Sequence, residues 1–192
     1  MFLFAAVVPP ESVREWVSAA VDAAGGAGPA GNELERVPVE AMRMPITGFG
    51  NLALPEVRRL SATLRATVRE WEAAPLVRFS GATALEWPED RSVWLKLQGE
   101  VDELTQIARS IPSAVRNLGL LVDRRRFRPW LEVGSITPFT TAEYLEHLVA
   151  ELDRSEGPEW RLPAISLLRM RWGAPGEPGE TEELERFELA FA

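Results

Sequence analysis

The stretch RRRFRPWLEVG at residues 124–134 decides the fold, together with VEAMRMPITGFGNL at residues 39–52. Apolar and β-favouring residues predict a strand over Phe127–Val133 in the first stretch and a strand over Met42–Thr47 in the second. Each strand ends at a glycine, and an amphipathic helix follows it, starting near Pro55 and near Thr141. The two halves of the chain therefore contain a weak internal repeat, in which a strand, a glycine and a helix follow one another.

Periodicity predicts the remaining elements around these two strands. Helices are expected over 13–24, 54–71, 101–118 with a restart at Pro112, and 141–152, the last one opened by a capping box of Thr140 and Glu143. Further strands are expected over Phe2–Val8, Leu34–Val37, Pro75–Leu85, Arg91–Leu97, Trp160–Trp172 and Phe187–Phe191. Four helices among about eight strands indicate an α+β fold, and the length of 192 residues fits one domain, residues 1–192, made of two interleaved lobes.

Composition excludes several classes of chemistry. Lys plus Arg is 21 and Asp plus Glu is 29, and the net charge of −8 argues against a protein that binds DNA or RNA through bulk electrostatics. The chain has no cysteine and one histidine, His147, which excludes thiolate nucleophiles and any site that needs two histidines. No apolar run reaches the ~18 residues of a membrane span. We expect a cytoplasmic protein with no metal, no cofactor and no membrane contact.

Four segments together resemble one known family, the 2H phosphoesterase superfamily in its bacterial RNA 2′,3′-cyclic phosphodiesterase (2′-5′ RNA ligase-like) branch. The opening MFLFAAVVPPESVREWV looks like the first strand, proline turn and helix of that branch. Residues 39–52 and 124–134 lie where its two His-x-Thr motifs belong, and FRPW at 127–130 is the most specific match. WRLPAISLLRMRWGAPGEPGETEELERFELAF at 160–191 looks like the closing hairpin.

The resemblance implies a bilobal fold of two pseudo-symmetric antiparallel sheets that face a central cleft, with helices on the outer faces. In that family, the two His-x-Thr motifs face each other across the cleft. One histidine acts as general base and the other as general acid on a cyclic phosphate, while the hydroxyls hold phosphate oxygens. Residues i and i+2 of a strand share a face, which explains the spacing of the motif.

This sequence departs from the family at every catalytic position. Arg43 and Pro45 stand where the first histidine and threonine belong, and Trp130 and Glu132 stand where the second pair belongs. Arginine stays protonated and tryptophan transfers no protons. His147 is predicted on the solvent side of its helix. We therefore expect the fold without the hydrolysis, and no catalytic residue.

The sequence leaves three alternatives for the cleft. Alternation predicts that Arg43, Pro45 and Thr47 share one face and that Arg128, Trp130 and Glu132 share another. In the first alternative, Trp130 fills the cleft and Arg43 stacks on it or pairs with Glu132.

In the second alternative the cleft binds a nucleotide or an RNA end. Arg43 would hold a phosphate and Trp130 would stack a base. Thr47 and Ser135 would donate hydroxyls to the ligand. The candidates for ligand binding are Arg43, Thr47, Arg128, Trp130, Glu132 and Ser135. In the third alternative, Glu132 is the general base of an altered cyclic phosphodiesterase.

Two charged segments lie outside the motifs. The run Arg124–Arg128 carries four arginines and Phe127, which is either an RNA-binding patch or a solvated turn. The acidic segment Glu177–Glu185 is expected to be a solvated hairpin loop. The sequence predicts no particular protein partner.

Overall fold

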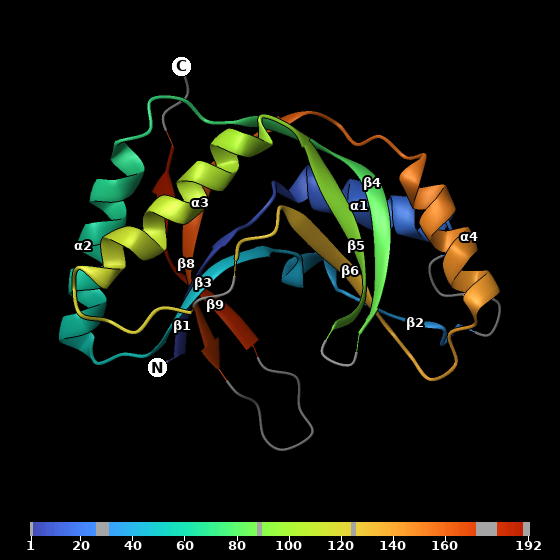
Figure 1. Ribbon diagram of the computed structural model, residues 1–192, viewed down its shortest axis with the longest axis horizontal. Coiled ribbons are helices and arrows are strands. Elements are labelled where there is room, and N and C mark those ends of the chain that lie inside the picture. Colours follow the sequence, from blue (N-terminus) through green and yellow to red (C-terminus); the bar gives the residue numbers. More distant parts are fainter. Residues whose placement is uncertain (1, 26–30, 88–89, 124–125, 172–179, 190–192) are drawn as a thin grey trace.

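The computed structural model describes residues 2–25, 31–87, 90–123, 126–171 and 180–189 (Figure 1). Within them, the chain forms two antiparallel sheets and four α-helices. The elements are β1 Phe2–Val7, α1 Glu11–Ala23, β2 Leu34–Arg36, the 3₁₀ turn η1 Val39–Ala41, β3 Met44–Asn51, α2 Leu54–Arg69, β4 Leu76–Trp87, β5 Asp90–Gly99, α3 Val101–Arg116, β6 Trp130–Ile136, α4 Ala142–Asp153, β7 Trp160–Arg161, β8 Ala164–Arg171 and β9 Glu180–Glu188. No helix in these ranges is long and apolar enough to cross a membrane.

The two sheets form two lobes that face a central cleft. The first sheet has the order β3-β1-β8-β9 and is covered by α2 and α3, and the second has the order β2-β6-β5-β4-β7 and is covered by α1 and α4 (Figure 1). The helices lie on the outer faces, so the helix-free face of each sheet is turned toward the other lobe. The predicted α+β fold with two facing sheets is confirmed.

Helix boundaries follow from local sequence. Pro55 lies in the first turn of α2, and the Glu56 carboxylate accepts a hydrogen bond of 2.8 Å from the N–H of Ala53. The cap of α4 is Thr141, whose hydroxyl accepts from the N–H of Tyr144 at 3.2 Å. The predicted cap, Thr140, is therefore wrong by one residue.

The predicted restart at Pro112 is wrong, because α3 runs unbroken from Val101 to Arg116. Ile111 and Val115 on either side of the proline are both fully buried. Their burial against the main core stabilises a helical conformation that proline itself disfavours.

Replacing Pro112 by alanine is expected to raise the free energy of unfolding by about 1–3 kcal/mol, because the interior of the helix regains an N–H donor. Urea unfolding followed by circular dichroism measures it. Pro55→Ala is the matched control, since proline is well tolerated at a helix start, and we expect almost no change there. Equal effects at both positions would contradict this account.

Several strand predictions also need correction. Residues 160–172 were expected to form one strand, but Leu162 and Pro163 separate β7 from β8, which belong to different sheets. A proline cannot donate to a ladder, which favours a break there. The last strand begins at Glu180 rather than Phe187, so the described part of the predicted acidic loop is strand, and residues 177–179 lie outside the described ranges. The two motif strands start two or three residues later than predicted.

Candidate functional site in the central cleft

A β-bulge decides which side chains of β3 enter the cleft. Pro45 pairs with Ala6 and Thr47 pairs with Ala5, which leaves Ile46 as an extra residue. Ala5 belongs to the main core, whereas Ala6 lies on the helix-free face. Paired residues share a face, so Pro45 points into the cleft and Thr47 points away from it.

The predicted common face of Arg43, Pro45 and Thr47 is therefore wrong for Thr47. The Thr47 side chain is only 5% exposed, and its hydroxyl donates to the carbonyl of Asp123 at 3.2 Å. The bulge, which simple alternation does not anticipate, turns this hydroxyl toward the segment that follows α3.

A matching bulge occurs in β6. Glu132 pairs with Trp94 and Gly134 pairs with Val93, which leaves Val133 as the extra residue. Val93 and Val133 belong to the main core, so Glu132 and Trp94 lie on the helix-free face. The close approach of Leu34 explains the glycine, because a Cβ at Gly134 would lie 2.6 Å from its Cγ.

The two bulges fall at equivalent positions of the two motif segments. In each strand the bulge follows directly after the third motif residue, at 46–47 in β3 and at 133–134 in β6. Each sheet thus presents the first and third motif residues to the cleft, and the next two residues to the interior. This equivalence supports the predicted pseudo-symmetry of the lobes.

The first motif residue, Arg43, lies over the ring of Phe4. Its Cζ is 5.5 Å from the ring centroid, and its Nη1 donates to the carbonyl of Ala41 at 3.1 Å. Burial lowers the pKa of Arg43 below its ordinary value. No ion pair or cation–π contact joins Arg43 to Glu132 or Trp130 in the described part of the chain. The first alternative, in which Arg43 stacks on Trp130 or pairs with Glu132, is therefore wrong. Arg43 lies over the ring of Phe4, on the adjoining strand, instead.

Trp130, the first residue of the second motif, is in contact with a different arginine, Arg128. The Arg128 Cζ lies 5.6 Å from the Trp130 ring centroid, and Arg128 Nη1 donates to Asp90 Oδ2 at 2.9 Å. Asp90 Oδ1 also accepts from Nε1 of Trp94 at 3.2 Å. These contacts form an aromatic wall, consisting of Trp94 and Trp130, in which the charge of Arg128 is balanced by Asp90.

Glu132 is held by two serine hydroxyls. Its Oε1 accepts from Ser92 Oγ at 2.7 Å and from Ser135 Oγ at 3.3 Å. The hydroxyl of Ser135, predicted to bind a ligand, is therefore engaged with Glu132. The pair of serines positions the carboxylate on the cleft face.

An apolar wall faces the cleft from the first sheet. It is separate from the main core, and side chains of β1 and β8 that pair across the strands form it. Its members are Phe4, Ala6 and Leu168, which are buried, and Phe2, Val8 and Met170, which are partly buried. Sequence analysis missed this wall, although the alternation of Phe2 and Phe4 with core residues Leu3 and Ala5 indicates it.

The remaining predicted residues lie elsewhere. His147 is exposed on α4, as predicted, and no metal-binding group of carboxylates or histidines occurs among the described residues. Arg124 and Arg125 lie outside the described ranges, and Arg126 is exposed. The predicted RNA-binding role of this run stays a prediction.

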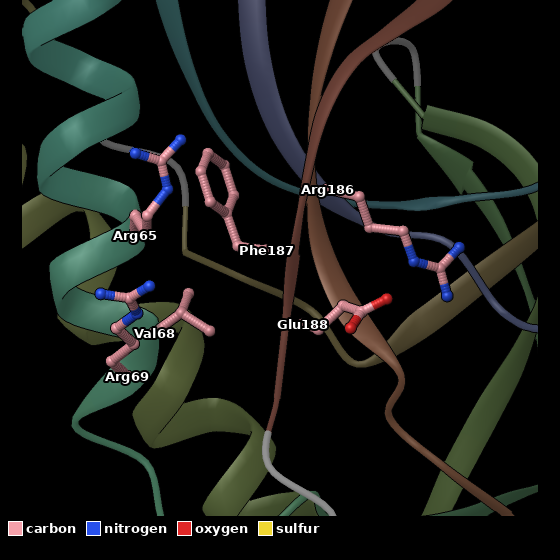
Figure 2. Close-up of a pocket in the computed structure, with 6 residues that line it drawn as sticks. All are labelled: Arg65, Val68, Arg69, Arg186, Phe187 and Glu188. Carbon is pink, nitrogen blue, oxygen red and sulfur yellow. The ribbon is translucent and has the colours of Figure 1, made fainter.

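A shallow notch of about 260 Å³ lies between α2 and β9, lined by Arg65, Val68, Arg69, Arg186, Phe187 and Glu188 (Figure 2). Arg65 forms an ion pair with Glu185. Phe187 points toward α2, whereas Arg186 and Glu188 point to the other side of β9 (Figure 2). The lining thus spans both faces of an edge strand rather than converging on one point.

No protein-family model and no curated protein matches the sequence. Solved structures do match over nearly the whole chain. TT0787 of Thermus thermophilus has a TM-score of 0.73 and 21% identity, with 98% of each chain covered. Escherichia coli LigT complexed with 3′-AMP has a TM-score of 0.71 and 17% identity, with 97% of each chain covered. The fold is that of the 2H phosphoesterases.

A third solved structure has a similar fold. The MHV ns2 PDE domain has a TM-score of 0.56 and 12% identity, covering 96% of this chain and 100% of the domain. LigT has also been solved with ATP, NADP⁺ and phosphate. Identities this low establish the fold alone.

Proposed function

We propose that this 2H phosphoesterase-fold protein does not hydrolyse phosphodiesters and uses its central cleft to bind a ligand. The observation that carries the proposal is the orientation of the motif positions. Strand register places the third motif residues, Pro45 and Glu132, on the cleft face just before each bulge, and the first motif residues are Arg43 and Trp130. The scaffold is present, but the two histidines are not.

Hydrolysis of a cyclic phosphate needs one group that accepts a proton and another that donates one. The guanidinium of Arg43 remains a cation at neutral pH and cannot accept a proton. The indole of Trp130 does neither. His147 lies on the exposed side of α4, a helix on the outer face, and does not reach the cleft.

Retention of ligand binding is supported by the chemistry of the two facing walls. One wall is apolar and carries a cation, Arg43, and the other is aromatic and carries the hydrogen-bonded carboxylate of Glu132. The complexes of LigT with 3′-AMP and ATP support the idea that a cleft of this fold accommodates small molecules.

One observation favours a second candidate, an active RNA 2′,3′-cyclic phosphodiesterase. Glu132 occupies a motif position on the cleft face and is half-buried. It would be the general base of such an enzyme, and the conjugate acid would have to come from another group.

The purified protein is expected to leave 2′,3′-cyclic AMP and an RNA ending in a 2′,3′-cyclic phosphate intact, because the cleft lacks a matched base and acid. Phosphorus NMR and reversed-phase chromatography measure hydrolysis directly. The Glu132→Gln variant is tested alongside and is expected to be identical. Turnover that copurifies with the protein and disappears in Glu132→Gln would establish the second candidate instead.

A further inference from the structure

The cleft contains a partly buried cation, Arg43, for which the described part of the chain provides no counterion. Arg43 donates to a backbone carbonyl and lies over Phe4, and none of its partners among the described residues is a carboxylate. A desolvated cation is costly unless an opposite charge accompanies it, and its lowered pKa has the same physical cause. A bound anion would supply the missing charge.

The strands beside Phe4, the ring that Arg43 covers, present mostly apolar side chains to the cleft, and their polar members are Ser166 and its hydrogen-bond partner Glu183. Phe4 is 7% and Leu168 is 4% exposed, while Phe2, Val8 and Met170 remain partly exposed on the same face. A hydrophobic surface beside a single charge suits a molecule that has an apolar body and one charged head.

The opposite wall strengthens this point. Arg128 is already neutralised by Asp90, so Trp94 and Trp130 offer aromatic surface with no spare positive charge from Arg128. Glu132 adds a negative charge on the same face. A second anionic group on the ligand would meet the Glu132 carboxylate beside Trp94, and Lys96, which pairs with Trp130, is a cation on the same face.

The charge of the two helix-free faces disfavours polyanions. Among the described residues, strand pairing and the contact of Arg43 with Phe4 place similar numbers of the two charges on these faces. The carboxylates are Glu35, Asp90, Glu132, Glu156, Glu183 and Glu188, and the cations are Arg43, Arg78, Lys96, Arg128, Arg161 and Arg186. Figure 2 shows Arg186 and Glu188 on the side of β9 away from α2. Nucleic acid and nucleoside polyphosphates need an excess of positive charge, which these faces do not have.

We propose that the ligand of this cleft is an amphiphilic carboxylate, whose head binds the Arg43 guanidinium and whose apolar body lies against Phe2, Val8 and Met170. This inference rests on the proposed function, because it names the ligand class of the same cleft. Two N–H groups of the guanidinium can hold a carboxylate in a bidentate geometry. The body would bury apolar area that now faces water.

Isothermal titration calorimetry of the full chain with decanoate tests the proposal, with decylamine, 2′,3′-cyclic AMP and ATP as comparison probes. We expect decanoate to bind and the other three to bind at least about tenfold more weakly. In Arg43→Met, which keeps the length and apolar stem but removes the charge, decanoate is expected to bind about tenfold or more weakly. Arg58→Met, an exposed arginine on the outer helix α2, is the matched control and is expected to bind like the wild type.

A second variant protects the test against misfolding of the first. Met170→Glu adds a carboxylate beside the apolar wall and is expected to abolish decanoate binding while circular dichroism shows an unchanged fold. Tight binding of 2′,3′-cyclic AMP in place of decanoate would overturn the carboxylate and leave the proposed ligand-binding function standing. Binding of neither would overturn both. Hydrolysis of the cyclic nucleotide would overturn the proposed absence of catalysis.

Discussion

The quadruple variant Arg43→His, Pro45→Thr, Trp130→His and Glu132→Thr is expected to hydrolyse 2′,3′-cyclic AMP. The substitutions rebuild both His-x-Thr motifs at the first and third positions. A positioned general acid or base contributes roughly 10²–10⁴-fold to a rate, so we expect at least about a hundredfold gain over the wild type. Liquid chromatography of the nucleotide products measures the rate.

Two half-restored variants control this experiment. One carries only Arg43→His with Pro45→Thr, and the other carries only Trp130→His with Glu132→Thr. Each has a single histidine in the cleft, and the reaction needs both a base and an acid, so we expect neither to show the gain. A folded quadruple variant no faster than the two halves would mean that the cleft does not hold the motifs at the distance the chemistry requires.

The largest expected effect on stability comes from Gly99→Ala. Gly99 has φ of +101°, and a Cβ there would lie 2.5 Å from the carbonyl oxygen of Leu76 and 3.2 Å from Cα of Val77. The backbone conformation disfavours an L side chain, and the clash is with main chain rather than with a movable side chain. We expect a loss of about 3–5 kcal/mol in the free energy of unfolding, measured by urea denaturation.

Gly50→Ala separates the two causes. Gly50 also has a positive φ, +69°, but nothing lies within 4 Å of its Cβ position. Only the backbone cost applies, so we expect about 1–2 kcal/mol. If the two variants lose the same stability, then β4 moves away from Gly99 at little cost and the steric argument fails.

Much of the fold could be predicted because hydrophobic periodicity survives in single sequences. The valines of α1 at 13, 17 and 21 are all buried, as their spacing predicts. The predicted succession of a strand and a helix is also present twice, as β3 followed by α2 and as β6 followed by α4. The error at Pro112 has a different origin. Local propensity predicts a break, but burial of Ile111 and Val115 outweighs it, and only the tertiary structure contains that information.

The site was less predictable for a reason of geometry. Strict alternation along the strand predicts that Thr47 faces the cleft. A one-residue β-bulge at Ile46 places its side chain on the opposite face of the sheet. The partner of Arg43 depends on strand order, because β1 lies beside β3 and brings Phe4 within reach. Neither bulges nor strand order follow from alternation alone.

The paired bulges also affect which residues of such a protein can be substituted during evolution. The first and third motif residues, which come before each bulge, face the cleft, whereas the two residues that follow the third one pack inside. The two sets are therefore under separate physical constraints. An exchange at Arg43 or Trp130 is expected to change what the cleft binds while the buried residues at each bulge keep the same packing. An architecture divided in this way can lose one chemistry and acquire another while its interior stays the same.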